Sequence, residues 1–158
     1  MRWRFPDKAL SFSPWESILT LKAGSLEEYS LLNIWGESAC APASLLLEGC
    51  IQSARWLVEA SSSFSLSCEP AEITFWQAPS GLRPGERFCM FLRVAERGSK
   101  YVRFILRQKI LLPNEPPPAP EIWQVGDRID GVLTCTLTPL SEHYLPVDRA
   151  SLWQEIAP

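Results

Sequence analysis

The sequence has very little histidine and no closely spaced pair of cysteines. Its 158 residues include one histidine, His143, and five cysteines, no two of which form a CxxC pattern. A zinc site of the HExxH type needs two histidines, while zinc knuckles and thioredoxin-like redox sites need CxxC. The first class is excluded and the others are disfavoured, so we expect no metal and no cofactor.

Long apolar runs and an excess of positive charge are missing as well. No stretch approaches the roughly 18–20 apolar residues of a membrane span, and residues 1–10 lack the apolar core of a signal peptide. With 15 basic and 18 acidic residues the net charge is −3, whereas a dedicated nucleic-acid binder is clearly basic. We therefore expect one cytoplasmic, soluble domain over residues 1–158, with no membrane and no nucleic-acid partner.

Positive charge is concentrated in one segment. Residues 81–112 hold eight basic and two acidic residues, a net charge of +6, which leaves −9 for the rest of the chain. Such a segment is either a docking face for an acidic partner or a strand face in contact with water.

The clearest helical pattern covers residues 43–60. Pro42 and Ser44 suit a helix start, and most of the helix circumference is apolar, which is typical of a buried helix. At 100° per residue its long polar side chains fall on one narrow stripe. The members of this polar stripe are Glu48, Gln52, Arg55 and Glu59.

Strand patterns occupy most of the remaining chain. Alternating or β-rich runs cover residues 8–13, 17–22, 65–78, 86–94, 101–112 and 131–138. A turn separates the first two runs, Gly98-Ser99 predicts a hairpin, and the proline-rich stretch 113–120 predicts a loop. Short helices are expected at about 25–32 and 146–156. One long helix wrapped by a curved antiparallel sheet accommodates this order, which is an α+β fold.

Three short motifs follow one another along the chain. They are Pro42-Ala-Ser-Leu-Leu-Leu-Glu48-Gly-Cys-Ile-Gln52, Leu82-Arg-Pro84-Gly85-Glu86 and Glu96-Arg-Gly-Ser-Lys-Tyr-Val-Arg-Phe104. In this order and spacing they resemble the 3-hydroxyacyl-acyl carrier protein dehydratases, a family of the hot-dog fold, over about residues 8–138. The resemblance implies a hot-dog fold, a dimer with active sites built across the subunit interface, and an acyl thioester of acyl carrier protein or coenzyme A as substrate.

The chain departs from this family at one decisive position. The family's catalytic histidine stands fourteen residues before the glutamate, where this chain has Ile34, followed by Trp35 and Gly36. In the family that histidine removes a proton from C2 of the thioester, and the glutamate of the partner subunit protonates the leaving hydroxyl. His143 lies outside the matching region, 95 residues after Glu48, so the usual dehydration has no obvious base.

The resemblance assigns candidate roles at the start of the long helix. Glu48 matches the catalytic carboxyl group, with Gln52 one turn later as its hydrogen-bond partner; alternatively both belong only to the polar stripe. The backbone N–H groups of Ala43 and Ser44 match the site that holds the thioester carbonyl oxygen, although every helix start presents such groups.

Further candidates flank this helix. Ile34, Trp35 and Gly36 are expected to line the substrate site in place of the missing motif. Arg55 and Glu59 are expected to form a helix-surface pair or a subunit contact. The residues that could receive an acidic carrier protein, or simply form a solvated strand face, are Arg97, Lys100, Arg103 and Arg107.

The sequence thus predicts an acyl-thioester protein of dehydratase type, in fatty-acid or related lipid biosynthesis, with an incomplete catalytic dyad. Two alternatives stay open. In one, Glu48 alone serves as base or nucleophile of a hot-dog thioesterase. In the other, the chain binds acyl groups without catalysis, or pairs with a histidine-bearing paralogue as the partner subunit of an active dehydratase.

Overall fold

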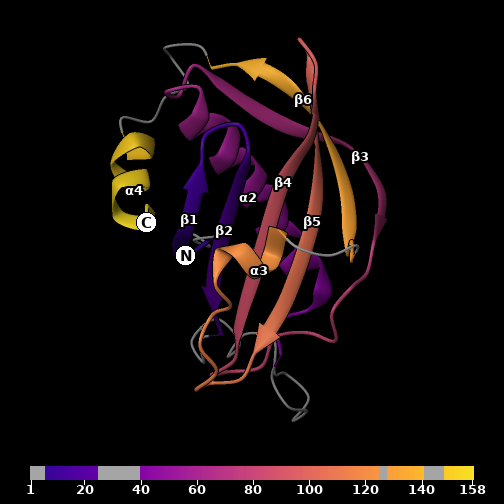
Figure 1. The fold of residues 1–158 in the computed structure, drawn as a ribbon, viewed down its shortest axis with the longest axis vertical. Helices are drawn as coiled ribbons and strands as arrows, with labels where there is room; N and C mark the ends of the chain where they lie inside the picture. Colours follow the sequence, from indigo (N-terminus) through magenta and orange to yellow (C-terminus); the bar gives the residue numbers. More distant parts are fainter. Residues whose placement is uncertain (1–5, 25–39, 125–127, 141–147) are drawn as a thin grey trace.

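The computed structural model describes residues 6–24, 40–124, 128–140 and 148–158, and Figure 1 shows its elements. In chain order these are β1 (Lys8–Ser13), β2 (Ser17–Ala23), α2 (Ala43–Ser61), β3 (Leu66–Trp76), β4 (Arg87–Arg97), β5 (Tyr101–Leu111), α3 (Pro120–Gln124), β6 (Gly131–Pro139) and α4 (Asp148–Ile156). The expected helix at 43–60 and all six strands are confirmed. The expected helix at 25–32 lies outside the described residues, as does the start of the closing helix.

Two elements correct the sequence-based expectation. β4 continues to Arg97 instead of ending at Val94, because a bulge between Val94 and Glu96 interrupts the alternation of apolar and polar residues without ending the strand. The short helix α3 directly follows the proline-rich stretch, where we expect only loop; five residues are too few to show a helical period.

The six strands form one antiparallel sheet in the order β1-β2-β4-β5-β6-β3. Tight connections set two of its hairpins. Trp15 adopts a positive φ of 57° in the β1–β2 turn, and the Gly98 N–H donates to Tyr101 O at the β4–β5 turn. β4 and β5 pair along nearly their whole lengths, whereas β6 pairs with β5 only over Tyr101–Leu106. Figure 1 shows the two long central strands side by side.

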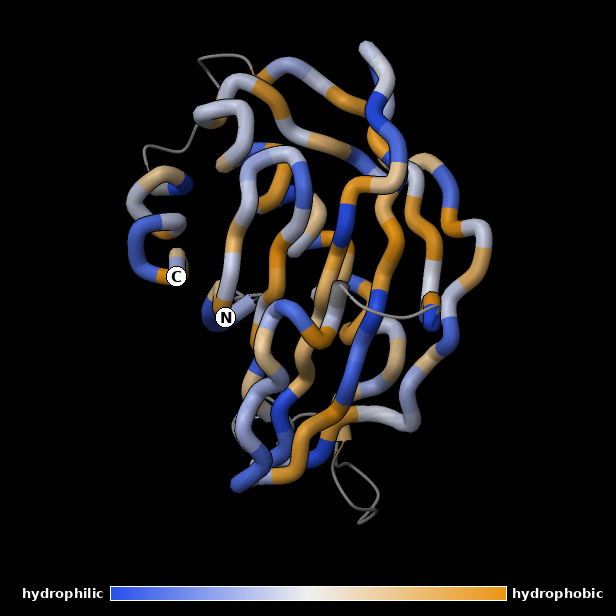
Figure 2. Tube along the Cα trace, viewed as in Figure 1, coloured by the Kyte–Doolittle hydropathy of each residue, from blue (hydrophilic) through white to orange (hydrophobic). Residues whose placement is uncertain are grey.

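Helix α2 packs against one face of the sheet. Its buried side chains include Leu46, Cys50, Ala54 and Leu57, which belong to one cluster with apolar residues from the facing strands. Apolar segments recur along α2 and the central strands in Figure 2. Because this helix has almost no polar circumference, burial against a wrapping sheet is the only arrangement that removes most of it from water. The expected α+β architecture is confirmed.

The opposite face of the sheet carries a second, smaller apolar cluster. It contains Leu19, Cys89, Phe91 and Leu111, and Trp123 of α3 covers it with its ring centroid 6.2 Å from that of Phe91. The chain from Pro113 to α3 therefore crosses the outer face of the sheet and shields apolar side chains from water.

Candidate active site

Two backbone hydrogen bonds fix the start of α2. The Ala41 N–H donates to Leu82 O at 2.7 Å, and the Leu82 N–H returns a bond to Ala41 O at 3.2 Å. Gly81 makes this approach possible: its φ is +110°, and a Cβ there would lie 3.0 Å from Ala41 O. The motif around Leu82 thus determines where the long helix begins.

The first turn of α2 has no side-chain cap. Pro42 is the N-cap residue and its carbonyl accepts the N–H of Leu45 at 3.0 Å. The N–H groups of Ala43 and Ser44 precede the first hydrogen bond within the helix, and Ser44 is exposed. The helix dipole adds partial positive charge here, so this end of α2 suits an oxygen that gains negative charge.

Glu48 and Gln52 lie together on the half-buried side of α2. Nε2 of Gln52 donates to Oε1 of Glu48 over 2.6 Å, one turn apart on the helix. Ser44, Glu48 and Gln52 follow one another at intervals of about one turn, so they lie along one side of α2. Ala43 and Ser44 lie in the first turn of the helix, whereas Gln52 lies at its midpoint.

The other two members of the polar stripe, Arg55 and Glu59, do not form the expected pair. Arg55 binds Cys68 O at 3.2 Å and the Glu69 carboxylate at 2.5 Å, so it does not pair with Glu59. Glu59 is only 2% exposed and accepts hydrogen bonds from Ser67 Oγ and Arg149 Nε, both at 2.6 Å. The prediction of an Arg55–Glu59 surface pair was wrong, because partners distant in sequence cover this end of the helix.

The four basic candidates do not share one face. Arg97 pairs with Val102, which is buried towards α2, and its guanidinium lies 3.5 Å from the Trp15 ring centroid. Arg103 is on the other face and forms a 2.8 Å ion pair with Glu96. Arg107 shares that outer face with Phe91 and donates to Trp123 O over 2.5 Å.

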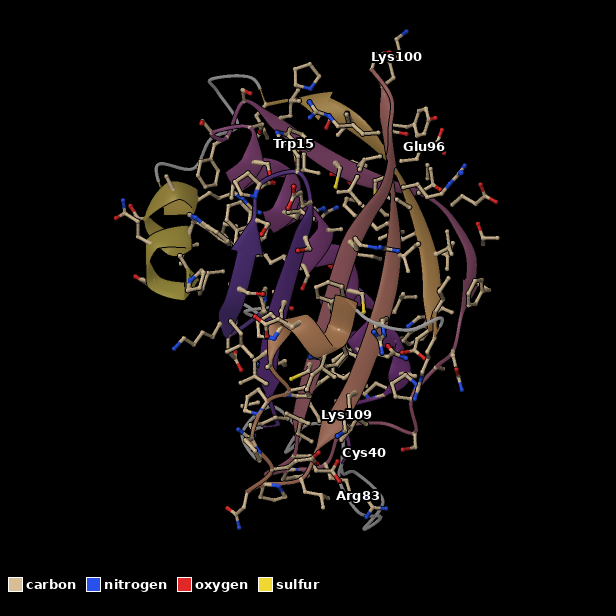
Figure 3. All side chains as sticks on the ribbon, viewed as in Figure 1. Trp15, Cys40, Arg83, Glu96, Lys100 and Lys109 are labelled. Atoms are coloured by element: carbon tan, nitrogen blue, oxygen red, sulfur yellow. The ribbon has the colours of Figure 1, made fainter. Side chains whose placement is uncertain are left out.

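Three of these basic candidates, Arg97, Lys100 and Arg103, belong to the β4–β5 hairpin, away from the end of the molecule where α2 begins. Figure 3 shows Lys100 and Trp15 towards one end, whereas Cys40 and Arg83 lie at the end where α2 begins. At 1.5 Å per residue, the 19 residues of α2 span about 28 Å. The β4–β5 hairpin and the start of α2 lie towards opposite ends of the molecule, and a role for Arg97, Lys100 and Arg103 in docking a carrier protein stays a prediction.

The remaining candidates lie outside the described residues. These are Ile34, Trp35, Gly36 and His143. Among the residues that the structure does describe, no three His, Cys, Asp or Glu side chains are grouped to hold a metal ion. In the same part of the chain, no helix is long and apolar enough to cross a membrane.

The buried thiols contribute no reactive group. Burial raises the pKa of Cys50 to about 12 and that of Cys89 to about 11, and all five cysteines are free. A thiol with so high a pKa is protonated at neutral pH and is a poor nucleophile.

Sequence reasoning missed one concave feature. A cavity of about 450 Å³ lies at the end of β5, between α3, the segment after β3 and the segment before β6. Its charged lining residues are Arg107, Lys109, Arg128 and Asp130. Only the concentration of basic residues in 81–112 hinted at it, because the other walls come from segments far apart in sequence.

Comparison with known proteins adds structural matches only. No family model and no curated protein matches this sequence. A Streptococcus mutans protein, smu.793, solved bound to acetyl CoA, superposes with a TM-score of 0.58 at 11% identity, over 90% of this chain and 96% of that chain. A hypothetical thioesterase from Streptococcus pneumoniae, solved with coenzyme A, gives 0.52 at 8% identity, over 85% and 88% of the two chains.

A third match is the dehydratase heterocomplex ApeI:P of Xenorhabdus doucetiae, with a TM-score of 0.51 at 9% identity, over 90% of this chain and 86% of that chain. These matches span nearly the whole sheet and its helix. The chain has the hot-dog fold. The hot-dog fold expected from the three motifs is therefore confirmed, whereas membership of the dehydratase family stays a resemblance, because identities this low establish the fold alone.

Proposed function

We propose that this hot-dog protein binds an acyl thioester at the start of α2 and hydrolyses it with Glu48. The observation that carries the proposal is the 2.6 Å hydrogen bond from Gln52 to Glu48, one turn from a helix start without a side-chain cap. The structural neighbours support the substrate class, since one was solved with acetyl CoA and another is a hypothetical thioesterase with coenzyme A.

The proposed reaction needs one carboxylate and one oxyanion site. As a general base, Glu48 takes a proton from water while the water oxygen attacks the thioester carbonyl carbon. The carbonyl oxygen becomes negative and accepts hydrogen bonds from the N–H groups of Ala43 and Ser44. When the C–S bond breaks, the proton passes to the departing thiolate, and the products are a carboxylic acid and a thiol. Direct attack by Glu48 as a nucleophile is the variant of this route.

Dehydration is the second candidate function. It needs a base at C2 of the substrate, and the position that supplies it in the resembling family is Ile34 here. A partner subunit that carries a histidine would complete the dyad, and one structural neighbour is a dehydratase heterocomplex. In that case this chain supplies only Glu48, and the isolated protein eliminates no water.

We further propose a homodimer formed through the outer edge of β3. That strand pairs with β6 on one side only, and it exposes Ile73 and Phe75 by 41% and 46%. An exposed apolar edge strand is a template for pairing with another chain. Changing Phe75 to Lys should yield a monomer in light scattering, whereas Leu112→Lys, at a more exposed apolar residue outside the edge, should leave the dimer intact. A Phe75→Lys protein that stays dimeric would exclude this edge.

The test of the reaction uses three kinds of thioester. Saturated, enoyl and 3-hydroxyacyl thioesters are incubated with the protein, with Glu48→Ala and with Glu16→Ala, an exposed carboxylate in the β1–β2 turn, and products are followed by mass spectrometry. We expect release of thiol that falls by 10²–10⁴-fold in Glu48→Ala only. Loss of water from the 3-hydroxyacyl substrate would indicate a dehydratase instead. Absence of turnover on every thioester would retire the stand-alone enzyme.

A further inference from the structure

The cavity at the end of β5 has the composition of a binding site for an anion with an apolar or aromatic part. Its volume of about 450 Å³ falls within the usual range of small-molecule sites, roughly 300–1,000 Å³. Ile110, Ile122 and Trp123 supply apolar surface, and Gln77 and Gln108 supply amides.

Positive charge dominates the lining. Among the lining residues that the structure describes, four are charged: Arg107, Lys109 and Arg128 are cationic, and Asp130 is the one carboxylate. Asp130 is 1% exposed, and its oxygens accept the Arg128 Nε–H and the Gln108 backbone N–H, both at 2.8 Å. These bonds hold the acidic wall of the cavity in place.

Arg128 and Lys109 can bind a ligand with little loss of folding stability. The Arg128 side chain is 67% exposed, and that of Lys109 is 48% exposed in an ion pair with Glu115. The Lys109–Glu115 pair is largely exposed and contributes little to stability, so Lys109 can exchange its partner. Arg128 bonds the buried Asp130 through Nε and can add a partner at its other guanidinium donors. A phosphate group, with several acceptor oxygens and up to two charges, is the partner that these donors bind best.

The cavity is also close in the chain to the candidate active site. Gln77, Pro79 and Ser80 form one wall, and Leu82, two residues after Ser80, makes the backbone bonds to Ala41 that fix the start of α2. Lys109 lies at the same end of the molecule as Cys40 and Arg83 (Figure 3). A long ligand can therefore occupy the helix start with one end and the cavity with the other.

We propose that this cavity binds the phosphorylated nucleotide end of a coenzyme A thioester, with its phosphate groups on Lys109 and Arg128. The inference rests on the proposed function, and it names the carrier that the sequence left open. An acyl carrier protein presents pantetheine on a protein and has no nucleotide to fill the cavity. Coenzyme A presents an adenine for the apolar wall and three phosphate groups for the cations.

The test measures binding by calorimetry for ligands that lose one part at a time. The ligands are coenzyme A, dephospho-coenzyme A, pantetheine, adenosine 3′,5′-bisphosphate and ATP. The variants are Lys109→Gln and Arg128→Gln, with Lys8→Gln and Arg93→Gln as matched controls on exposed strand positions away from the cavity. Arg107 is left unchanged because it binds the carbonyl groups of α3.

We expect coenzyme A to bind more tightly than pantetheine, and each cavity variant to weaken it by about 10-fold, with no change in either control. Pantetheine binding should be equal in all five proteins. Equal binding of coenzyme A by wild type and both cavity variants would overturn the proposal. Tighter binding of ATP than of coenzyme A would overturn it too, since the occupant would then be a free nucleotide.

The proposed function and this inference fail in different ways. If pantetheine thioesters and coenzyme A thioesters are hydrolysed equally well by wild type and by Lys109→Gln, Glu48 chemistry stands and the cavity assignment falls. If no thioester is hydrolysed but coenzyme A binds and the two variants weaken it, the cavity assignment stands and the hydrolase falls. Thermal unfolding of each variant checks that the fold is intact.

Discussion

Two carboxylates on one stripe of α2 have opposite surroundings. Glu48, near the helix start, is half-buried, and within the described part of the chain its hydrogen-bond donor is the neutral amide of Gln52. Glu59, three turns later, is 2% exposed and lies between Ser67 and Arg149. In sequence the two are interchangeable members of a polar stripe. In the structure, residues of β3 and α4 cover Glu59, whereas Glu48 stays half-buried.

The difference separates a structural carboxylate from a candidate functional one. The Glu59–Arg149 ion pair has a buried carboxylate and a guanidinium that lies 4.4 Å from the Trp56 ring centroid, so it is part of the packing of the domain. A carboxylate with one amide partner keeps oxygen lone pairs free for a substrate or a water molecule. The comparison predicts that stability and activity respond to different ends of the same helix.

The largest effect should come from Glu59→Ala. This change leaves the Arg149 guanidinium and the Ser67 hydroxyl without their acceptor, so the free energy of unfolding should fall by about 2–4 kcal/mol. Glu48→Ala, the matched change at the open end, should alter it by less than about 1 kcal/mol. Urea unfolding followed by circular dichroism measures both, and equal losses would erase the distinction.

Trp153→Ala should rank second. The Trp153 ring stacks on Trp56 with centroids 5.7 Å apart and meets Phe12 edge-on at 5.0 Å, so α4 depends on it. We expect a loss of about 2 kcal/mol in the free energy of unfolding. Gln154→Ala, at the exposed neighbouring position, is the control and should change it by less than about 0.5 kcal/mol. If both variants unfold at the same urea concentration, α4 contributes no such packing.

Gln52→Leu tests the open end without removing the carboxylate. The change abolishes the hydrogen bond that orients Glu48, so kcat for thioester hydrolysis should fall by about 10-fold, with KM and stability nearly unchanged. Steady-state kinetics on the best thioester provides the measurement. A fall in stability with unchanged kcat would instead make Gln52 a structural residue.

The smallest expected effect is a difference in thiol reactivity between the start of α2 and its buried part. Cys40 is exposed next to the helix start, whereas Cys50 is buried within α2 and its pKa is raised to about 12. The buried thiols are inaccessible, so a thiol reagent such as Ellman's should at pH 8 titrate one cysteine in the folded protein and five in urea. Rapid reaction of a second cysteine would show that the body of the helix opens as readily as its start.

Local pattern determined most of the architecture. The helix expected at 43–60 differs from the observed one by a single residue at its end. It was predictable because its continuous apolar surface and the helix-starting Pro42 are properties of the segment itself. The Gln52–Glu48 bond was equally foreseeable, since residues four apart on a helix face each other.

Features that need partners from distant segments were not foreseeable. The burial of Glu59 depends on Arg149, and the separation of Arg97 from Arg103 depends on a bulge that reverses which face Arg97 occupies. The cavity beside Lys109 is lined by residues of β4, β5 and α3 and of the segments after β3 and before β6. No hydrophobic periodicity in the sequence predicts that these segments meet.

The burial of Glu59 depends on a residue that is synthesised much later. Its partner Arg149 follows it by 90 residues, which a ribosome adds in about 5–18 s. Until then Glu59 of the nascent helix lacks its partner Arg149, and Trp56 lacks the Trp153 ring that stacks on it. A chain stopped before Arg149 can still bury most of α2 against the sheet, but the end that carries Trp56 and Glu59 then lacks the cover that α4 provides.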